Sequence, residues 1–143
     1  MEKTLPHDQV LVRLGCSPIH GIGVFALQDI KAGTNVFATD ERDITWVAAD
    51  DLQNLEDFQR ALYRDFAIRR GNEFGCPESF NLLTVGWYVN EPSAGEAPNL
   101  VATPAFDLIA ARNITRGEEL TIRYSSFSDA SSDRVIAEKG PQG

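Results

Sequence analysis

The sequence has few of the residues on which several classes of protein site depend. Its two cysteines, Cys16 and Cys76, lie 60 positions apart, and neither has a cysteine or histidine at metal-ligand spacing. This pattern indicates neither a metal site nor a disulfide framework, and we expect both thiols to be buried, as free cysteines commonly are. The two histidines, His7 and His20, make Ser/His or Cys/His nucleophilic catalysis an unfavoured interpretation.

Long apolar runs and an excess of positive charge are also absent. Hydrophobic residues make up 43% of the chain, but no run approaches the roughly 18 to 20 apolar residues that a membrane span needs. The N-terminal stretch "MEKTLPHDQV" lacks the apolar core of a secretory signal, so we expect a cytoplasmic location, with the nucleus left open. A net charge of −8 opposes direct nucleic-acid binding and favours a basic protein or peptide partner.

The length and the local patterns predict one mainly β domain. A chain of 143 residues is long enough for one ordinary core and too short for two. Residues 10–14 read as a strand, "CSPIHGIG" as a turn-rich segment, and "VFAL" as the next strand. The tail 129–143 is polar, with Gly and Pro at its end, and is expected to be flexible.

An internal repeat is the most regular feature of the sequence. "ALQDIKAGTNVFA" is echoed 84 residues later by "AARNITRGEELTI", and the alignment pairs Ile30 with Ile114 and Gly33 with Gly117. Each copy predicts a strand, a glycine turn that needs positive φ, and a second apolar strand. Two such hairpins that face each other would form a compact β core.

The segment between the repeats predicts a short helix followed by strands. Leucine and phenylalanine recur at spacings of three and four, which favours an amphipathic helix with Asp50 or Asp51 as its N-cap. The apolar positions of this pattern are Leu52, Leu55, Phe58 and Leu62. From about Tyr63 we favour a strand, and the β-branched and aromatic stretch "LLTVGWYVN" predicts another.

Three separated stretches, taken in order, resemble the SET domain, a family of S-adenosylmethionine-dependent protein lysine methyltransferases. They are "SPIHGIGVFALQDIKAG", "WYVNEPSAGEAPN" and "IAARNITRGEELTIRY". The resemblance covers about residues 10–128, with 43–80 as a variable insert that helps to shape a substrate groove. It implies a single SET-like domain over 1–143, built as a β-clip of small sheets with a short helical insert and a C-terminal pseudoknot.

The resemblance also implies a cofactor, S-adenosylmethionine, and a set of site residues. Glycines at 21 and 23 would let the backbone approach a ligand closely, and Asn90 offers both a donor and an acceptor. Tyr124 would be the catalytic residue, and Tyr88 and Phe127 would line the channel for the acceptor lysine. The implied cofactor contacts are His20, Gly21, Ile22, Gly23, Asn90 and Glu91.

Several positions depart from the family pattern and leave alternatives open. Glu91 and Pro92 stand where the family has His and Ser, and Tyr124 is the last tyrosine, so a second C-terminal tyrosine is missing. Arg123, where an acidic residue is often seen, is expected to be neutral for the chemistry. The main hypothesis is an active protein lysine methyltransferase. The alternatives are an inactive SET-like binding module and a β-clip interaction domain without a cofactor.

Overall fold

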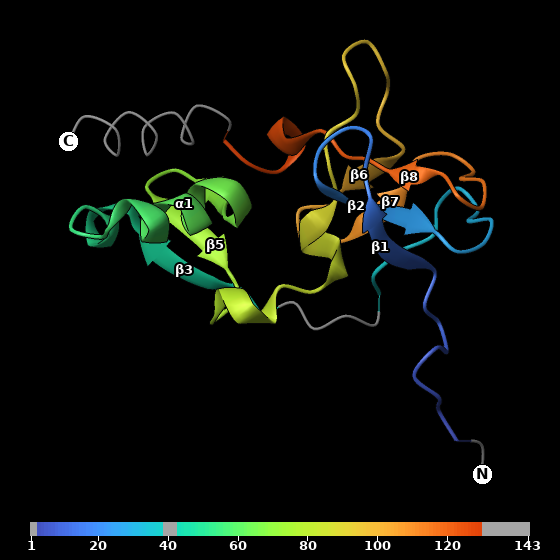
Figure 1. The fold of residues 1–143 in the computed structure, drawn as a ribbon, viewed down its shortest axis with the longest axis horizontal. Helices are drawn as coiled ribbons and strands as arrows, with labels where there is room; N and C mark the ends of the chain where they lie inside the picture. The colour runs from blue at the N-terminus through green and yellow to red at the C-terminus, as the bar shows by residue number, and fades with distance from the viewer. Residues whose placement is uncertain (1–2, 39–42, 130–143) are drawn as a thin grey trace. The chain divides into compact units, whose positions relative to one another are not determined.

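The structure, a computed structural model, describes residues 3–38 and 43–129 (Figure 1). The chain divides into two compact units, one formed by Met1–Asp40 with Thr84–Arg123 and the other by Glu41–Leu83 with Tyr124–Gly143. Each unit is described by itself below. Residues 130–143 of the expected flexible tail lie outside the described residues. The single domain stays a prediction.

The first unit contains small antiparallel sheets and a turn of 3₁₀ helix. One sheet has the strand order β1-β2-β8, and a second sheet pairs β6 with β7. The bounds are Val12–Cys16 for β1, Ile22–Ala26 for β2, Leu100–Ala102 for β6, Leu108–Ala110 for β7 and Glu119–Leu120 for β8. The 3₁₀ helix η3, Val85–Tyr88, packs against β1 and β2. The most deeply buried apolar residues of this unit are Val24, Leu100, Ile114, Leu120 and Ile122.

The second unit combines a three-stranded antiparallel sheet, in the order β3-β5-β4, with the α-helix α1. Its bounds are Thr45–Ala48 for β3, Asp57–Phe66 for α1, Ile68–Arg70 for β4 and Glu73–Cys76 for β5. Short 3₁₀ helices occupy Ala49–Leu52 (η1), Phe80–Leu82 (η2) and Tyr124–Ser126 (η4). Several small sheets with one short helix confirm the predicted mainly β fold class. Within the described ranges no helix is long and apolar enough to cross a membrane.

The two sequence repeats pair with each other in a reciprocal ladder. The backbone amide of Ile30 donates to the carbonyl of Ile114, and the amide of Ile114 donates back to Ile30, both at 2.8 Å. The side chains repeat the same relation. Oδ1 of Asp29 accepts from the amide of Arg116 at 2.8 Å, and Oδ1 of the equivalent Asn113 accepts from the amide of Ala32 at 2.9 Å. The offset of 84 residues is therefore an approximate two-fold relation in space, and the two copies face each other as predicted. The predicted hairpins were wrong in one respect, because the strands pair between the copies, as β2 does with β8 and Asn35 with Ile109, and not within a copy.

Equivalent glycines turn the chain in the two copies. Gly33 and Gly117 have φ angles of +88° and +89°. Their amides donate to the carbonyls of Ala110 and Ala26, respectively, both at 2.8 Å. A residue with a side chain rarely adopts such a φ angle, so the backbone itself requires glycine at both turns.

The predicted helix exists, but its start and its end were both wrong. Asp50 and Asp51 lie in η1, and α1 begins later, after Glu56 as its N-cap. The side chains of Glu56 and Gln59 form a reciprocal capping box that satisfies free amides of the first turn. The helix then runs through Tyr63, where we expected a strand, and ends at Phe66; the amide of its C-cap residue, Ala67, donates to the carbonyl of Tyr63.

The apolar positions of this segment do not all lie on the helix: Leu52 belongs to η1, whereas Phe58 and Leu62 belong to α1. Leu52 is buried against Phe74 in the core of the second unit, with Leu55 and Tyr63 packed around them. Phe58, in contrast, is 72% exposed. Because the chain changes from η1 to α1 between these positions, their sequence spacing does not place them on one helical face.

The predicted strand over "LLTVGWYVN" was wrong. The segment forms η2 and η3 instead, and the amide of Trp87 donates to the carbonyl of Thr84 at 3.0 Å. At Gly86 a Cβ would lie 3.5 Å from the ring of Phe37, so this turn is packed closely against another part of the unit. Such tertiary packing overrides the β propensity of the segment.

The two cysteines differ in their surroundings. Cys76 is buried, as predicted, and burial raises the pKa of its thiol. The prediction was wrong for Cys16, which is exposed because it is the last residue of an edge strand.

The reciprocal ladder generates a prediction about its two turn glycines. Gly33→Ala and Gly117→Ala should each lower the free energy of unfolding by about 1 to 3 kcal/mol, because each forces a side chain onto a left-handed backbone. Urea denaturation measures this change. Gly86→Ala is the matched control, since its Cβ would make an ordinary 3.5 Å contact without a positive φ. Equal stability of all three variants would contradict the prediction.

Candidate functional site

The turn between β1 and β2 is closed by a backbone hydrogen bond and leaves one side open. The amide of Ser17 donates to the carbonyl of Gly21 at 2.8 Å. Gly21 has a φ of +46°, and apart from its two chain neighbours no described residue has an atom within 4 Å of the place where its Cβ would be. Glycine is therefore needed here for the backbone conformation, and the peptide groups next to it are not shielded by a side chain.

The hydroxyl of Ser17 ties this turn to β8. Its oxygen accepts from the amides of Ile19 and His20, at 3.0 and 3.3 Å. The same hydroxyl donates to the carboxylate of Glu119, whose two oxygens both lie 2.8 Å away. One short side chain thus organises the turn and anchors it to a strand more than a hundred positions later in the sequence.

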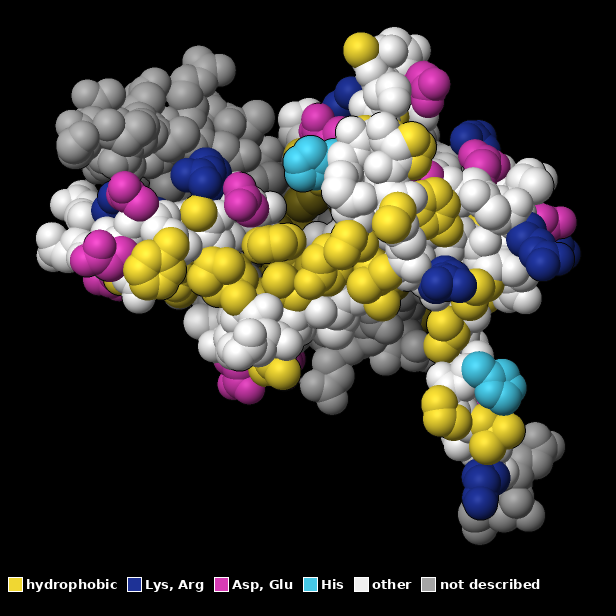
Figure 2. Space-filling view, viewed as in Figure 1, with side chains coloured by type: hydrophobic (Ala, Val, Ile, Leu, Met, Phe, Trp, Pro, Cys, Tyr) yellow, Lys and Arg dark blue, Asp and Glu magenta, His cyan; other side chains and the backbone are white. Residues whose placement is uncertain are grey.

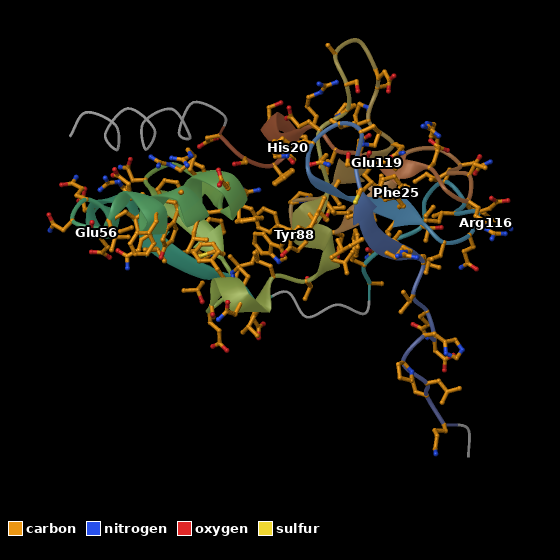
Figure 3. All side chains as sticks on the ribbon, viewed as in Figure 1. His20, Phe25, Glu56, Tyr88, Arg116 and Glu119 are labelled. Carbon is orange, nitrogen blue, oxygen red and sulfur yellow. The ribbon has the colours of Figure 1, made fainter. Side chains whose placement is uncertain are left out.

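Asn90 lies beneath the same turn and is 7% exposed. Its Nδ2 lies 3.0 Å from the carbonyl of His20, 3.3 Å from that of Ile22 and 3.0 Å from the carboxylate of Glu119. His20 and Glu119 are both labelled in Figure 3. An amide nitrogen has only two hydrogens, so these three acceptors share them. Within the described part of the chain, the side-chain oxygen of Asn90 accepts no hydrogen bond.

Glu119 is the site residue that sequence reasoning missed. A Cβ placed on Gly23 would lie 2.2 Å from Oε2 of Glu119 and 3.0 Å from Cβ of Ser17. The second glycine of the GxG pattern therefore makes room for this carboxylate, whereas we had assigned it to the approach of a ligand. The signal that was available is an acidic residue at a strand position, directly before the buried Leu120.

The loop "NEPSAGEAPN" is anchored to the β8 segment through the asparagine at each of its ends. The carbonyl of Asn90 accepts from the amide of Ile122 at 3.0 Å. Asn99 is buried; its Oδ1 accepts from the amide of Thr121 at 2.7 Å, and its Nδ2 donates to the carbonyl of Glu119 at 2.9 Å. The parallel bridge between Asn90 and Thr121 brings this loop and the C-terminal segment side by side.

Two of the positions that depart from the family pattern, Glu91 and Pro92, lie at the start of this loop. Pro92 is buried and Glu91 is half-buried, while Gly95 turns the chain with a φ of +84°. Arg123, expected to be neutral for the chemistry, donates from Nη2 to the carbonyl of Glu96 at 3.3 Å. It therefore helps to hold the loop.

The predicted channel residues belong to different units. Tyr124 and Phe127 form an edge-to-face pair in the second unit, with ring centroids 6.1 Å apart. Tyr88 is half-buried at the end of η3 in the first unit. The structure brings His20, Gly21, Ile22, Gly23, Asn90 and Glu91 into one region of the first unit. The channel itself stays a prediction.

Comparison with models of protein families shows to which family the chain belongs. The family model of the SET domain matches residues 21–125, which is more than half of the chain. The chain belongs to the SET domain family. The match begins at Gly21 and extends past Tyr124, so it includes all the predicted site residues except His20 and Phe127. Membership suggests protein lysine methyltransferase activity, and SET domains typically bind S-adenosylmethionine.

Solved structures support the fold of this SET domain. A Plasmodium falciparum protein that is provisionally named a histone methyltransferase matches with a TM-score of 0.50 and 20% sequence identity. The match covers 78% of the present chain and 90% of the other. At this identity the likeness concerns the fold alone. No curated protein sequence matches the chain.

The contact between Gly23 and Glu119 generates a prediction about stability. Gly23→Ala should lower the free energy of unfolding by about 1 to 3 kcal/mol, because the carboxylate must move away from Ser17 and Asn90. In the Glu119→Ala background the displaced carboxylate is absent, so the same substitution should lower the free energy of unfolding by a smaller amount. The difference between the two effects, the coupling energy, should be about 1 kcal/mol or more. Chemical denaturation of the four proteins in this double-mutant cycle measures the coupling. Strict additivity would show that the carboxylate does not determine the need for glycine.

Proposed function

We propose that this SET domain is a protein lysine N-methyltransferase that transfers a methyl group from S-adenosylmethionine to a lysine of a basic protein or peptide. The observation that carries the proposal is the attachment of Asn90 to the β1–β2 turn. The two motifs lie about seventy positions apart in the sequence, yet the Asn90 amide bonds the carbonyls of His20 and Ile22. The proposed cofactor contacts therefore form one surface.

The residues of this surface fit a ligand that carries an ammonium and a carboxylate group. The side-chain oxygen of Asn90 is an acceptor suited to an ammonium group, because its amide nitrogen is already used within the protein. The open side of Gly21 leaves the adjacent backbone accessible. We assign Gly21, Ile22, Asn90 and the backbone at Glu91 to the cofactor. His20 and Gly23 would act through the shape of the turn.

When bound, S-adenosylmethionine would supply an activated methyl group on a sulfonium centre. The protein must place the acceptor amine in line with that group, at about 3 to 3.5 Å, and positioning supplies most of the catalytic effect. The lysine must also be neutral. With an ordinary pKa near 10.4, losing its proton at pH 7 costs about 4 to 5 kcal/mol.

Aromatic side chains would reduce this cost by removing water from around the ammonium group. We assign Tyr124 the role of aligning the amine through its hydroxyl, and Tyr88 and Phe127 the role of lining the channel. The edge-to-face contact between Tyr124 and Phe127 supports a shared aromatic wall. In this role Phe127 compensates for the missing second tyrosine.

The charge of the second unit supports a basic substrate. Its segment 43–83 contains eight acidic residues and four arginines. The acidic side chains appear in magenta among apolar ones at the left of Figure 2. A negative surface attracts lysine-rich peptides over a distance of roughly 8 to 10 Å at moderate ionic strength.

The cofactor assignment predicts how Asn90 affects binding. Asn90→Ala should weaken the binding of S-adenosylmethionine and its demethylated product by about 1 kcal/mol or more, the scale of one hydrogen bond. Isothermal titration calorimetry measures this difference. Asn54→Ala, an exposed asparagine of the second unit, is the control and should bind like the wild type. If the folded wild type binds neither ligand, the chain is instead a β-clip interaction domain without a cofactor.

The catalytic assignment predicts a separation of turnover from binding. Tyr124→Phe should lower kcat by about 100-fold or more, as expected when the reacting groups lose their alignment, while the affinity for S-adenosylmethionine stays unchanged. Transfer of a labelled methyl group to basic lysine-containing peptides measures kcat. If the wild type binds the cofactor and the peptides but transfers no methyl group, the inactive binding module is the better assignment.

A further inference from the structure

The chain that follows Tyr124 is fastened to the edge of β4. The amide of Arg69 donates to Oγ of Ser128 at 2.8 Å, and the amide of Asp129 donates to the carbonyl of Arg69 at 2.9 Å. The amide of Gly71 donates to Oδ2 of Asp129, also at 2.9 Å. Because β4 is the outer strand of the sheet order β3-β5-β4 among the described residues, this segment lies along an edge of the sheet. We refer to these three hydrogen bonds as the β4 clamp.

The β4 clamp is linked directly to the backbone of Tyr124. The carbonyl of Tyr124 accepts from the amide of Phe127 at 3.1 Å and from the amide of Ser128 at 2.9 Å. Ser128 thus binds Tyr124 through its backbone and β4 through its side chain. The ring of Phe127, between these two attachments, packs edge-to-face against the ring of Tyr124.

The strand side of the β4 clamp is itself fixed in the core. Arg69 is 7% exposed, and its guanidinium carbon lies 4.4 Å from the centre of the Phe74 ring, which is fully buried. Its Nε donates to the carbonyl of Gly71. Two of the three β4 groups in the β4 clamp, the amide and the carbonyl of Arg69, therefore belong to a residue whose side chain packs in the core of the second unit.

From these contacts we propose that Ser128 and Asp129 are positioning residues for Tyr124. The variable insert, through residues 68–71, would then determine where the tyrosine hydroxyl lies. The proposal rests on the catalytic role of Tyr124 in the proposed function. It assigns to the insert a part in the chemistry, in addition to shaping the substrate groove.

The physical reason is the narrow tolerance of an in-line transfer. A displacement of about 1 Å can reduce the rate of such a reaction 100-fold. η4 is a single short turn, and its two backbone bonds to the Tyr124 carbonyl fix only its local shape. The β4 clamp relates this turn to a sheet, so its loss should change turnover without changing the cofactor surface, which lies in the first unit.

The test compares Ser128→Ala/Asp129→Ala with variants that keep the acceptor atoms. The double variant should lower kcat by about tenfold or more, a smaller loss than complete misalignment gives, with unchanged affinity for S-adenosylmethionine by calorimetry. Ser128→Thr and Asp129→Asn retain an acceptor oxygen and should keep most of the activity. Asp51→Ala, an exposed carboxylate of the same unit, is the control. If the double variant unfolds, Ser128→Ala alone provides the same comparison.

A second measurement reports on Tyr124 without depending on activity. The chain has three tyrosines, so biosynthetic 3-fluorotyrosine gives three fluorine NMR signals, and Tyr124→Phe identifies one of them. Loss of the β4 clamp should shift or broaden the Tyr124 signal and leave the signal of Tyr88 unchanged. An unchanged Tyr124 signal and unchanged kcat would overturn the clamp while leaving the proposed function intact. A shifted Tyr124 signal in the double variant, together with a wild type that transfers no methyl group, would support the clamp and refute the proposed function.

Discussion

The carboxylate of Glu119 is the interaction on which the first unit depends. It receives the hydroxyl of Ser17 from the β1–β2 turn and the amide of Asn90 from beneath that turn, and it occupies the space left by the missing side chain of Gly23. Segments from three distant parts of the sequence thus meet at one carboxylate. The ordering of the candidate cofactor surface follows from this contact, because both Ser17 and Asn90 also bond the turn itself.

The position of Glu119 depends in turn on the pairing between the two repeats. Glu119 belongs to the second repeat, and its partner across the sheet, Phe25, directly precedes the start of the first. The reciprocal hydrogen bonds between Ile30 and Ile114 determine how the two repeats are aligned. A slip of one residue would turn Glu119 to the opposite face of its strand and remove it from the turn. The pairing of Ile30 with Ile114 therefore helps to bring these separate motifs together at one site.

Sequence reasoning predicted the features that arise from local chemistry. It failed where contacts between residues far apart in the sequence determine the structure. The two facing repeats and their glycine turns could be predicted because matching isoleucines and glycines recur at one offset. The pairing of strands between the copies could not, because it depends on contacts far apart in the sequence. Glu119 could not, because its role depends on pairing with a strand more than ninety positions away. The 3₁₀ helices around Trp87 were missed because packing against the sheet overrides β propensity. The start of α1 was missed because Glu56 is a less common N-cap than the aspartates before it.

The reciprocal ladder has a consequence for how this chain can evolve. Each repeat supplies one donor and one acceptor to the reciprocal hydrogen bonds between Ile30 and Ile114, so these bonds use no group from the segment that connects the two copies. The entropic cost of that connection rises only slowly with its length. The connecting segment can therefore change in length at little cost to the pairing of the two copies, provided that it keeps the groups that reach back to the second copy. These groups are Asn90 and Asn99, which bond Glu119 and Thr121, and the backbone of Arg69 and Gly71, which holds the chain after Tyr124.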